Sequence, residues 1–314
     1  MRDFARALPV YVLLATAVGF VDWRTRTHND VVLTSYVPAV VHGTEPPPAK
    51  YRVLAPFAVA GVARILPVDP QISWVIGRWG LLFVTWIALH VLITTWFEAG
   101  VAVAGNTLLA ALLPLTFTNT WPPPDQFFEL ALSAAACAAI ARRRRWALAV
   151  ILVLAALNRE TSAFLVLLFG LSAHWCKRHV LWTGALAGLW ALVYVGLRLV
   201  LGFVPYSAWN LRQNLVFMGL SRHGLLRSGF DPYTRIYAWL FVLLLLGMAV
   251  PIVRTWGRQP RMVRAAVGVV TPVFVVVAML WSSVIETRIF TLLLPMLVPG
   301  LMFAWFSPTD QSVV

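Results

Sequence analysis

Charged residues are scarce in this chain of 314 residues. Asp, Glu, Lys and Arg make up 12% of it, whereas hydrophobic residues make up 60%. Soluble domains carry about a quarter charged residues, so the composition excludes an ordinary soluble globular protein. No polar stretch is long enough to form a separate soluble domain. We therefore expect a single all-α domain, a polytopic transmembrane helix bundle of about 8–10 spans.

Cysteine and the common cofactor motifs are also nearly absent. Cys137 lies inside an apolar run and Cys176 in a basic turn, which excludes a structural disulfide between them. The chain has no glycine-rich phosphate loop, no Cys-x-x-Cys pair and no His-Glu-x-x-His motif. We therefore predict no metal site and no certain cofactor, although a divalent metal stays possible.

Acidic residues are few, since 12 Asp and Glu stand against 25 Lys and Arg, for a net charge of +13. The basic residues gather in short turns between apolar runs, at Arg142–Arg145, Lys177–Arg178 and Arg254–Arg264. Such clusters mark the cytoplasmic loops of membrane proteins, and this distribution excludes nucleic acid as a partner. We expect a multi-pass protein of a bacterial cell (inner) membrane, with a cytoplasmic amino terminus.

One path through the membrane places all three basic clusters on the cytoplasmic side. It has a first span over residues 1–22, an extracytoplasmic loop with an interfacial helix over 23–71, and a helix bundle over 72–306. The expected spans of that bundle are 72–97, 101–118, 126–141, 180–203, 236–253, 265–281 and 289–306. The chain also has fifteen tryptophans, many of them at span ends, as expected for residues at the membrane interfaces.

Three segments do not fit straight spans. Residues 146–157 and 161–172 are shorter than the roughly 20 residues that a spanning helix needs, so they predict a pair of short helices. Residues 51–67 form either a short span or a helix on the extracytoplasmic side. We favour the second, because one more span here would place the later arginine clusters on the extracytoplasmic side. Residues 209–226 predict another interfacial helix.

This path gathers nine of the twelve acidic residues on the extracytoplasmic side. Ionisable groups near hydrocarbon are costly and tend to mark function, so a site is expected at that face. The nine residues are Asp22, Asp30, Glu45, Asp69, Asp125, Glu129, Glu160, Asp231 and Glu286.

Two of these acids follow the first span. Asp22 or Asp30, held just above the membrane, could act as a general base on an acceptor hydroxyl. Either residue could instead solvate a loop or pair with Arg24 or Arg26.

Two further motifs interrupt apolar sequence with a Glu/Arg pair. Arg159 beside Glu160, and Arg288 after Glu286, could hold a phosphate, for which a guanidinium has suitable geometry. Each pair could instead be a structural ion pair. Asp125 and Glu129 are four residues apart and share one face if a helix begins at Pro124. We favour a role as helix-start acids that complement the helix dipole over a role in the site.

Together these motifs resemble the GT-C class of integral-membrane glycosyltransferases, which use polyprenyl-phosphate sugars. The similar elements are short and spread over most of the chain: Asp30, Tyr36 and Gly43, then Pro46–Pro48 and Tyr51–Pro56, then Asn158–Thr161, then Glu286–Arg288 with Pro295. The chain departs from the class in lacking an Asp-Glu pair at Asp30.

The resemblance implies transfer of a hexosyl or pentosyl group from a lipid-linked donor at the extracytoplasmic face, with inversion. Asp30, or Asp22, would be the base, and Tyr51, Arg52, Arg159, Glu160, Glu286 and Arg288 would bind the donor. The implied partners are membrane lipid, a polyprenyl-phosphate sugar and a glycan, lipid or protein acceptor. Two alternatives stay open, a transporter or flippase of a lipid-linked or anionic substrate and a non-catalytic subunit of an envelope-assembly complex.

Overall fold

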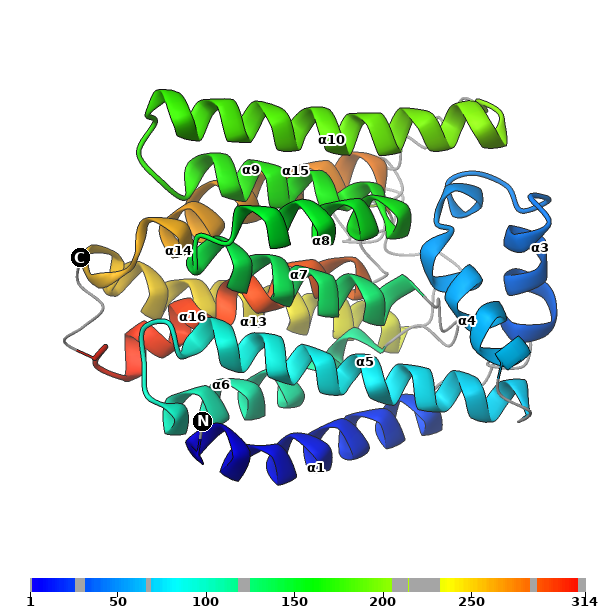
Figure 1. Cartoon of the computed structure of the whole chain (residues 1–314). Helices are drawn as coiled ribbons and strands as arrows, with labels where there is room; N and C mark the ends of the chain where they lie inside the picture. The colour runs from blue at the N-terminus through cyan, green and yellow to red at the C-terminus, as the bar shows by residue number, and fades with distance from the viewer. Residues whose placement is uncertain are drawn as a thin grey trace.

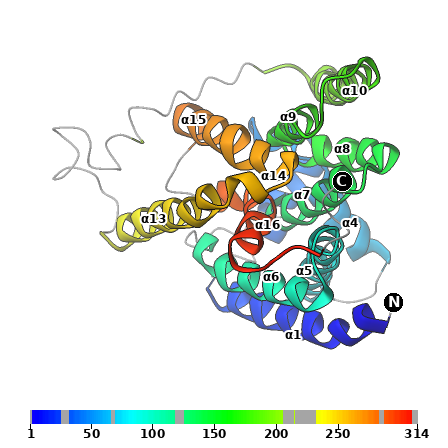
Figure 2. The ribbon, with the colours of Figure 1, turned by 90° about the vertical axis from the view of Figure 1, so that its left-hand side faces the viewer.

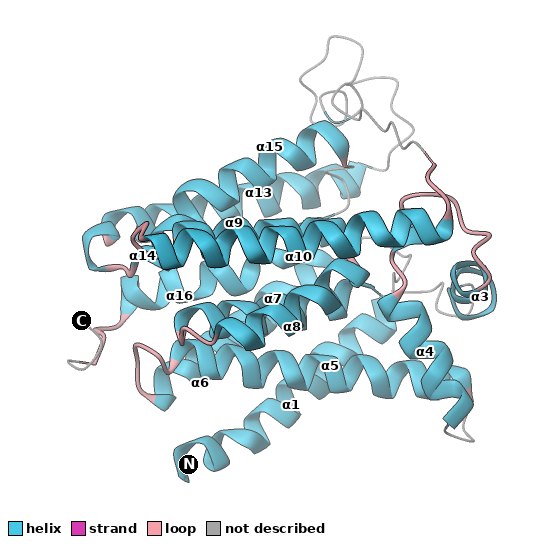
Figure 3. Ribbon diagram, turned by 45° about the horizontal axis from the view of Figure 1, so that its top comes forward, coloured by secondary structure: helices cyan, strands magenta, loops and turns pink. Residues whose placement is uncertain are grey.

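The structure, a computed structural model, describes residues 2–25, 32–65, 69–117, 125–204, 214, 232–282 and 287–309. Within these ranges the secondary structure is helical and no strand occurs (Figure 3). Five helical segments among the described residues are long and apolar enough to cross a membrane. The prediction of an all-α polytopic bundle is therefore confirmed.

The helices run back and forth along one direction (Figure 1). They are α1 (Arg2–Thr25), α5 (Pro70–Ile93), α6 (Ala99–Leu112), α7 (Asp125–Ala141), α8 (Arg145–Asn158), α9 (Ala163–Leu171), α10 (Lys177–Leu201), α13 (Pro232–Arg254), α14 (Arg261–Ala265), α15 (Thr271–Trp281) and α16 (Leu294–Trp305). The short helices α8 and α9 form the predicted pair. Several helices begin a few residues before the expected spans, as α10 does at Lys177 and α13 at Pro232.

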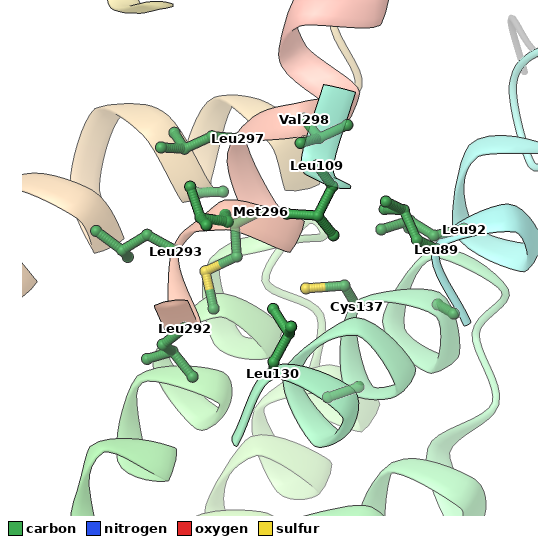
Figure 4. Close-up of a cluster of buried hydrophobic side chains, with 14 of the residues drawn as sticks. Leu89, Leu92, Leu109, Leu130, Cys137, Leu292, Leu293, Met296, Leu297 and Val298 are labelled. Carbon is green, nitrogen blue, oxygen red and sulfur yellow. The ribbon is translucent and has the colours of Figure 1, made fainter. Parts of the chain in front are cut away.

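Helix α7 lies at the centre of the bundle and contacts α5, α8 and α16. Its second half, residues 133–141, consists almost entirely of Ala, Ser and Cys, and small residues allow helices to approach closely in a membrane. In Figure 4, Leu130 and Cys137 of this helix lie close to Leu109 of α6 and Met296 of α16, and all four are buried.

Helices α1 and α10 lie on opposite sides of the bundle (Figure 2). Helix α10 exposes large aliphatic residues. Among them, Leu192, Leu199 and Val200 have 71%, 73% and 83% of their surface exposed. Exposed apolar area of this extent on a long apolar helix is expected to face lipid. Helix α10 is therefore a peripheral span.

The two ends of the bundle, which Figure 1 shows on its left and right, hold different charged residues of the sequence. The arginine end holds the three basic clusters at Arg142–Arg145, Lys177–Arg178 and Arg254–Arg264, together with both ends of the described chain. The opposite end, here the carboxylate end, holds the six described members of the nine acids expected to share one side: Asp22, Glu45, Asp69, Asp125, Glu129 and Glu160. The other three, Asp30, Asp231 and Glu286, lie outside the described residues.

The segment after α1 covers the carboxylate end. It contains a π-helical turn (Val32–Tyr36), α3 (Val37–Val41), a 3-10 turn (Ala49–Tyr51) and α4 (Leu54–Ile65). Helix α4 contacts the carboxylate-end parts of α5, α7 and α8 and does not run through the bundle (Figure 1). This placement agrees with the favoured interpretation of residues 51–67. The expected helix at 209–226 lies outside the described residues, except for Asn214.

The arrangement allows a direct test of orientation. Cys176 is exposed at the arginine end and Cys137 is buried, so the wild-type protein carries its own reporter. The positive-inside rule predicts that a membrane-impermeant maleimide labels Cys176 only after cells are permeabilised. In a Cys176→Ser background, Glu45→Cys at the carboxylate end should label in intact cells. The reverse pattern would invert the assignment of both ends.

Candidate functional site

The turn between α8 and α9 shapes the site. The backbone of Arg159 is extended, with φ −157° and ψ 146°, so the helix stops there. Asn158 donates its side-chain amide to the backbone carbonyl of Asp125 at 2.9 Å. The Ser162 hydroxyl donates to the Arg159 carbonyl at 2.7 Å and accepts from the Trp190 indole at 2.9 Å. These contacts fix the turn against α7 and α10. The direction in which the Arg159 side chain leaves the backbone is therefore fixed as well.

Five charged side chains meet beside this turn and form what we call the arginine–carboxylate network. Arg52 lies 3.2 Å from Asp125 through Nη1 and 2.8 Å from Glu160 through Nη2. Arg159 lies 3.2 Å from the same Asp125 oxygen through Nε and 2.5 Å from Glu129 through Nη1. The network therefore joins the loop before α4, the first turns of α7 and the turn between α8 and α9.

Burial differs within the network. Asp125, Glu129 and Arg159 have side chains at most 7% exposed, whereas that of Glu160 is 36% exposed. Glu129 also accepts a hydrogen bond from the Thr161 hydroxyl at 2.6 Å. Glu160 is thus the carboxylate of this network that a ligand can reach.

The charge balance limits what the network can bind. Two arginines stand against three carboxylates, which gives 2 − 3 = −1 when all five are ionised. A phosphate would meet guanidiniums that already have anionic partners. The network therefore suits hydroxyl groups and the positioning of a substrate better than primary binding of phosphate.

The contacts within the network also determine the pKa values of its ionisable groups. Burial alone would raise the pKa of Glu160, but the Arg52 guanidinium, its hydrogen bond and Arg159 outweigh burial and lower that pKa to about 2. Burial opposes the charge on Arg52, and the carboxylates of Glu160 and Asp125 more than compensate, so its pKa is raised. Burial, together with the nearby Asp125 carboxylate, raises the pKa of Tyr36 above its usual range. Tyr36 therefore lies beside the network as a neutral phenol.

A second buried ion pair joins α1 to α5. Asp22 is fully buried and pairs with Arg78 of α5. The Arg78 guanidinium also lies over the rings of Trp74 and Phe127, at 5.2 Å and 5.6 Å from their centroids. Because Phe127 lies between Asp125 and Glu129 in α7, one layer of side chains separates this ion pair from the network.

A groove of about 820 Å³ runs between α1 and α5 beside that pair. Its walls are mainly apolar, with Phe20, Ile72, Ile76 and Trp79, and Arg78 lines it as well. Asp69, the N-cap of α5, lies at its polar end and accepts from the Gln71 amide at 2.7 Å. The groove has the volume and apolar walls to hold the tail of a lipid.

On the opposite side of the bundle, Tyr51 anchors the loop to α10. Its hydroxyl donates to the Gly202 carbonyl at 2.9 Å and accepts from the Val204 amide at 3.0 Å. The Arg198 guanidinium lies over the Tyr51 and Tyr194 rings, 4.4 Å and 3.6 Å from their centroids. Within the described part of the chain no carboxylate pairs with Arg198, so it is a cation that can accept an anion.

The predicted site residues therefore separate into groups. The structure brings Arg52, Arg159 and Glu160 together, as the shared-site hypothesis requires, and places Tyr51 next to them. Asp22 lies one layer away in the pair with Arg78. Asp30 and Glu286 lie outside the described residues, and Arg288 is described only in its backbone, so their roles stay predictions.

Sequence reasoning missed several members of the site. Asp125 and Glu129 were interpreted as acids of a helix start, yet both are bound by arginines from distant segments. Their spacing of four residues was the available signal, since it places both on one face of a helix. Arg78 and Arg198 were not singled out, although each is an isolated arginine inside a long apolar run, and such residues are functional candidates by default.

Comparisons of the chain with protein-family models, curated proteins and solved structures gave no match. Among the described residues, no three His, Cys, Asp or Glu side chains form a group that could hold a metal ion. The functional assignment therefore depends on the geometry of the site.

The Asp22–Arg78 pair yields a stability prediction. Asp22→Asn leaves a buried guanidinium without its counter-charge and should destabilise the protein by about 3–5 kcal/mol. The double variant Asp22→Leu/Arg78→Met should recover most of that loss, because it removes both charges. Thermal unfolding in detergent measures both effects. An Asp22→Asn protein that is as stable as wild type but functionally impaired would instead assign Asp22 to the chemistry.

The lowered pKa of Glu160 predicts a pH dependence. A carboxylate with a depressed pKa stabilises the fold above its unfolded value, near 4.5, and loses that contribution as the pH falls through about 2. Glu160→Gln should therefore unfold at a lower temperature than wild type at neutral pH, and the two curves should converge as the pH approaches about 2. Glu45→Gln is the control, because burial raises the pKa of Glu45 and its ionised form does not stabilise the fold. A constant difference between Glu160→Gln and wild type across the range would contradict the assignment.

Proposed function

We propose that the protein is a membrane transferase that moves a sugar from a polyprenyl-phosphate donor to an acceptor at its carboxylate end. In this proposal that end faces the extracytoplasmic side of a bacterial inner membrane. The observation that carries the proposal is the buried arginine–carboxylate network at one end of a membrane bundle, with a lipid-sized groove on one side and Arg198 on the other. A transferase needs such an arrangement, because two substrates must approach one water-poor site from different directions.

The donor phosphate fits the Arg198 side best. Arg52 and Arg159 are already neutralised by carboxylates, whereas Arg198 has no carboxylate partner among the described residues. Arg198 lies one turn before the end of α10. A lipid tail can lie against the exposed aliphatic residues of this helix. Arg288 is the second cation that we assign to this phosphate, on the basis of its motif.

The acceptor fits the opposite side. The groove between α1 and α5 is apolar along its length and ends at Asp69. An acidic end disfavours a phosphate and favours a group that donates hydrogen bonds, such as a hydroxyl. We therefore assign the groove to the apolar part of a lipid acceptor, with its hydroxyl directed toward the network.

The reaction then follows the chemistry of an inverting transfer. The base takes the proton of the acceptor hydroxyl, its oxygen bonds to the anomeric carbon, and the bond from that carbon to the phosphate oxygen breaks. Polyprenyl phosphate leaves as an anion beside the cations. Glu160 is a weak proton acceptor because its pKa is about 2, and Asp125 and Glu129 are held by arginines. Of the two candidate bases that follow the first span, Asp22 is buried in its pair with Arg78, so we assign the base to Asp30.

Consumption of the donor tests this proposal. Purified protein in nanodiscs would be given polyprenyl-phosphate hexoses and pentoses, with release of polyprenyl phosphate as the readout. Asp30→Asn should lower turnover by about 10²–10⁴-fold and leave donor binding intact, because the amide cannot accept a proton. Arg198→Ala should weaken donor binding through loss of a contact to phosphate.

Arg178→Ala, which removes an arginine from the opposite end, is the matched control and should change neither quantity. Turnover by Asp30→Asn equal to that of wild type would remove the base assignment. Donor binding by Arg198→Ala equal to that of the control would remove the phosphate assignment.

A transporter is the second candidate, because polar side chains also lie inside the membrane part of α1, α5 and α6. The Tyr11 hydroxyl and His90 Nδ1 are 2.5 Å apart and buried, and the buried Asn106 donates to the Trp86 carbonyl at 3.2 Å. Intramembrane polar groups often line a substrate or proton path. Movement of a fluorescent lipid-linked sugar across proteoliposomes, lost in His90→Phe, would favour this candidate over the transferase.

A further inference from the structure

A second cavity lies at the arginine end, far from the arginine–carboxylate network. Its volume is about 800 Å³, and two of the three basic clusters contribute arginines to its lining. The turn between α7 and α8 supplies Arg143 and Arg145, and the segment between α13 and α14 supplies Arg258 and Arg261. His174, before α10, lines the cavity between them. Residues more than 100 positions apart in sequence thus place cations around one space.

Among the described residues, the charge of this cavity is positive and uncompensated. No Asp or Glu of that part of the chain lines the cavity, and none of its four arginines pairs with a carboxylate there. Arg261 is held in place, since it donates through Nε to the Leu171 carbonyl at 3.3 Å and lies 2.9 Å from His174 Nδ1 through Nη1. Arg145 packs over the Trp182 ring at 5.7 Å. Oriented cations around a concave space attract an anion from the surroundings.

The backbone at Arg143 gives independent support. Arg143 has φ 57°, the left-handed conformation, at the position after α7 where glycine is preferred. The Arg144 amide donates to Ala139 at 2.8 Å and the Arg143 amide to Ile140 at 3.0 Å, which closes the helix end. Glycine would fit this backbone without steric penalty. An arginine at such a position motivates the hypothesis that its side chain, which lines the cavity, has a function.

The depth of the cavity identifies the source of the anion. Trp146 and Trp175, which flank the clusters, are 76% and 70% exposed, and tryptophans of this kind lie at the level of lipid headgroups. Phe169, Met262 and Phe303 add apolar walls to the cavity. A cavity lined by both arginines and apolar side chains matches a phosphate joined to acyl chains.

We propose that this cavity binds the phosphate of an anionic phospholipid headgroup, from the leaflet opposite the transferase site. Basic pockets between transmembrane helices recognise such headgroups through charge-assisted hydrogen bonds. The bound lipid would hold together the turns after α7, before α10 and before α14. Binding is measured without any transfer activity, so its outcome is independent of the proposed function.

Thermal unfolding of the full chain in detergent tests the proposal, with short-chain phosphatidylglycerol as the probe. The anionic lipid should raise the unfolding temperature in a saturable way, because a ligand that binds only the folded state stabilises it. Short-chain phosphatidylcholine, with the same tail and no net charge, should not. Glycerol phosphate and inorganic phosphate should act only at much higher concentrations.

Two variants and one control localise the effect. Arg258→Ala and Arg143→Gly should each raise the half-saturating lipid concentration by about tenfold or more. Without lipid, Arg143→Gly should unfold at the wild-type temperature or above it, because glycine relieves the backbone, so weaker binding there cannot reflect misfolding. Arg178→Ala removes a charge from the same end without touching the cavity and should bind lipid as wild type does.

Three results would overturn the proposal. Equal stabilisation by phosphatidylcholine would show that the tail, not the phosphate, is recognised. Equal weakening in Arg178→Ala and Arg258→Ala would assign the effect to general surface charge. Saturation by inorganic phosphate at the same concentration as the lipid would make the ligand a soluble anion.

Discussion

The carboxylate of Asp125 is the contact on which the carboxylate end of this protein depends. One of its oxygens lies 3.2 Å from Arg52 and 3.2 Å from Arg159. These arginines come from the loop before α4 and from the turn between α8 and α9, and the carboxylate links both of them to the start of α7. Without it, the two guanidiniums would face each other with less counter-charge, which a site of low dielectric constant penalises strongly. Together with the Arg52–Glu160 pair and the Tyr51 contacts to α10, this carboxylate holds the covering segment over the bundle.

Within the membrane, small residues allow the helices to pack closely. A few polar contacts then set how these helices are aligned with one another. Asp22 with Arg78 and Tyr11 with His90 both join α1 to α5, one pair near each end of the shared interface. Hydrogen bonds between transmembrane helices average only about 0.6 kcal/mol, so the hydrogen-bonded pair adds little stability. Its value is geometric, because sliding α1 along α5 would separate both pairs at once.

Arginine has opposite roles at the two ends of the molecule. At the carboxylate end, Arg52 and Arg159 are buried and neutralised, and they orient carboxylates around a site. At the arginine end, Arg143 and Arg258 are exposed and have no carboxylate partner among the described residues. The first arrangement suits the positioning of a substrate and the second suits attraction of membrane anions. The same residue type thus serves two purposes because its surroundings differ.

The sequence by itself determined the fold class, the order of the helices and the separation of charge between the two ends. These features depend on local properties, namely the length of apolar runs and the position of arginines, and both are visible in one dimension. It also pointed to Arg159 and Glu160, because charged residues inside apolar sequence stand out, whereas Arg52 was predicted only from the resemblance of the segment around it. Only the tertiary structure decided that Asp125 and Glu129 belong with them, that Asp22 is bound to Arg78, and that four arginines surround one cavity. Such pairings depend on how helices rotate and pack against distant segments, and helix packing in a membrane is decided by small differences in shape that no single stretch of sequence contains.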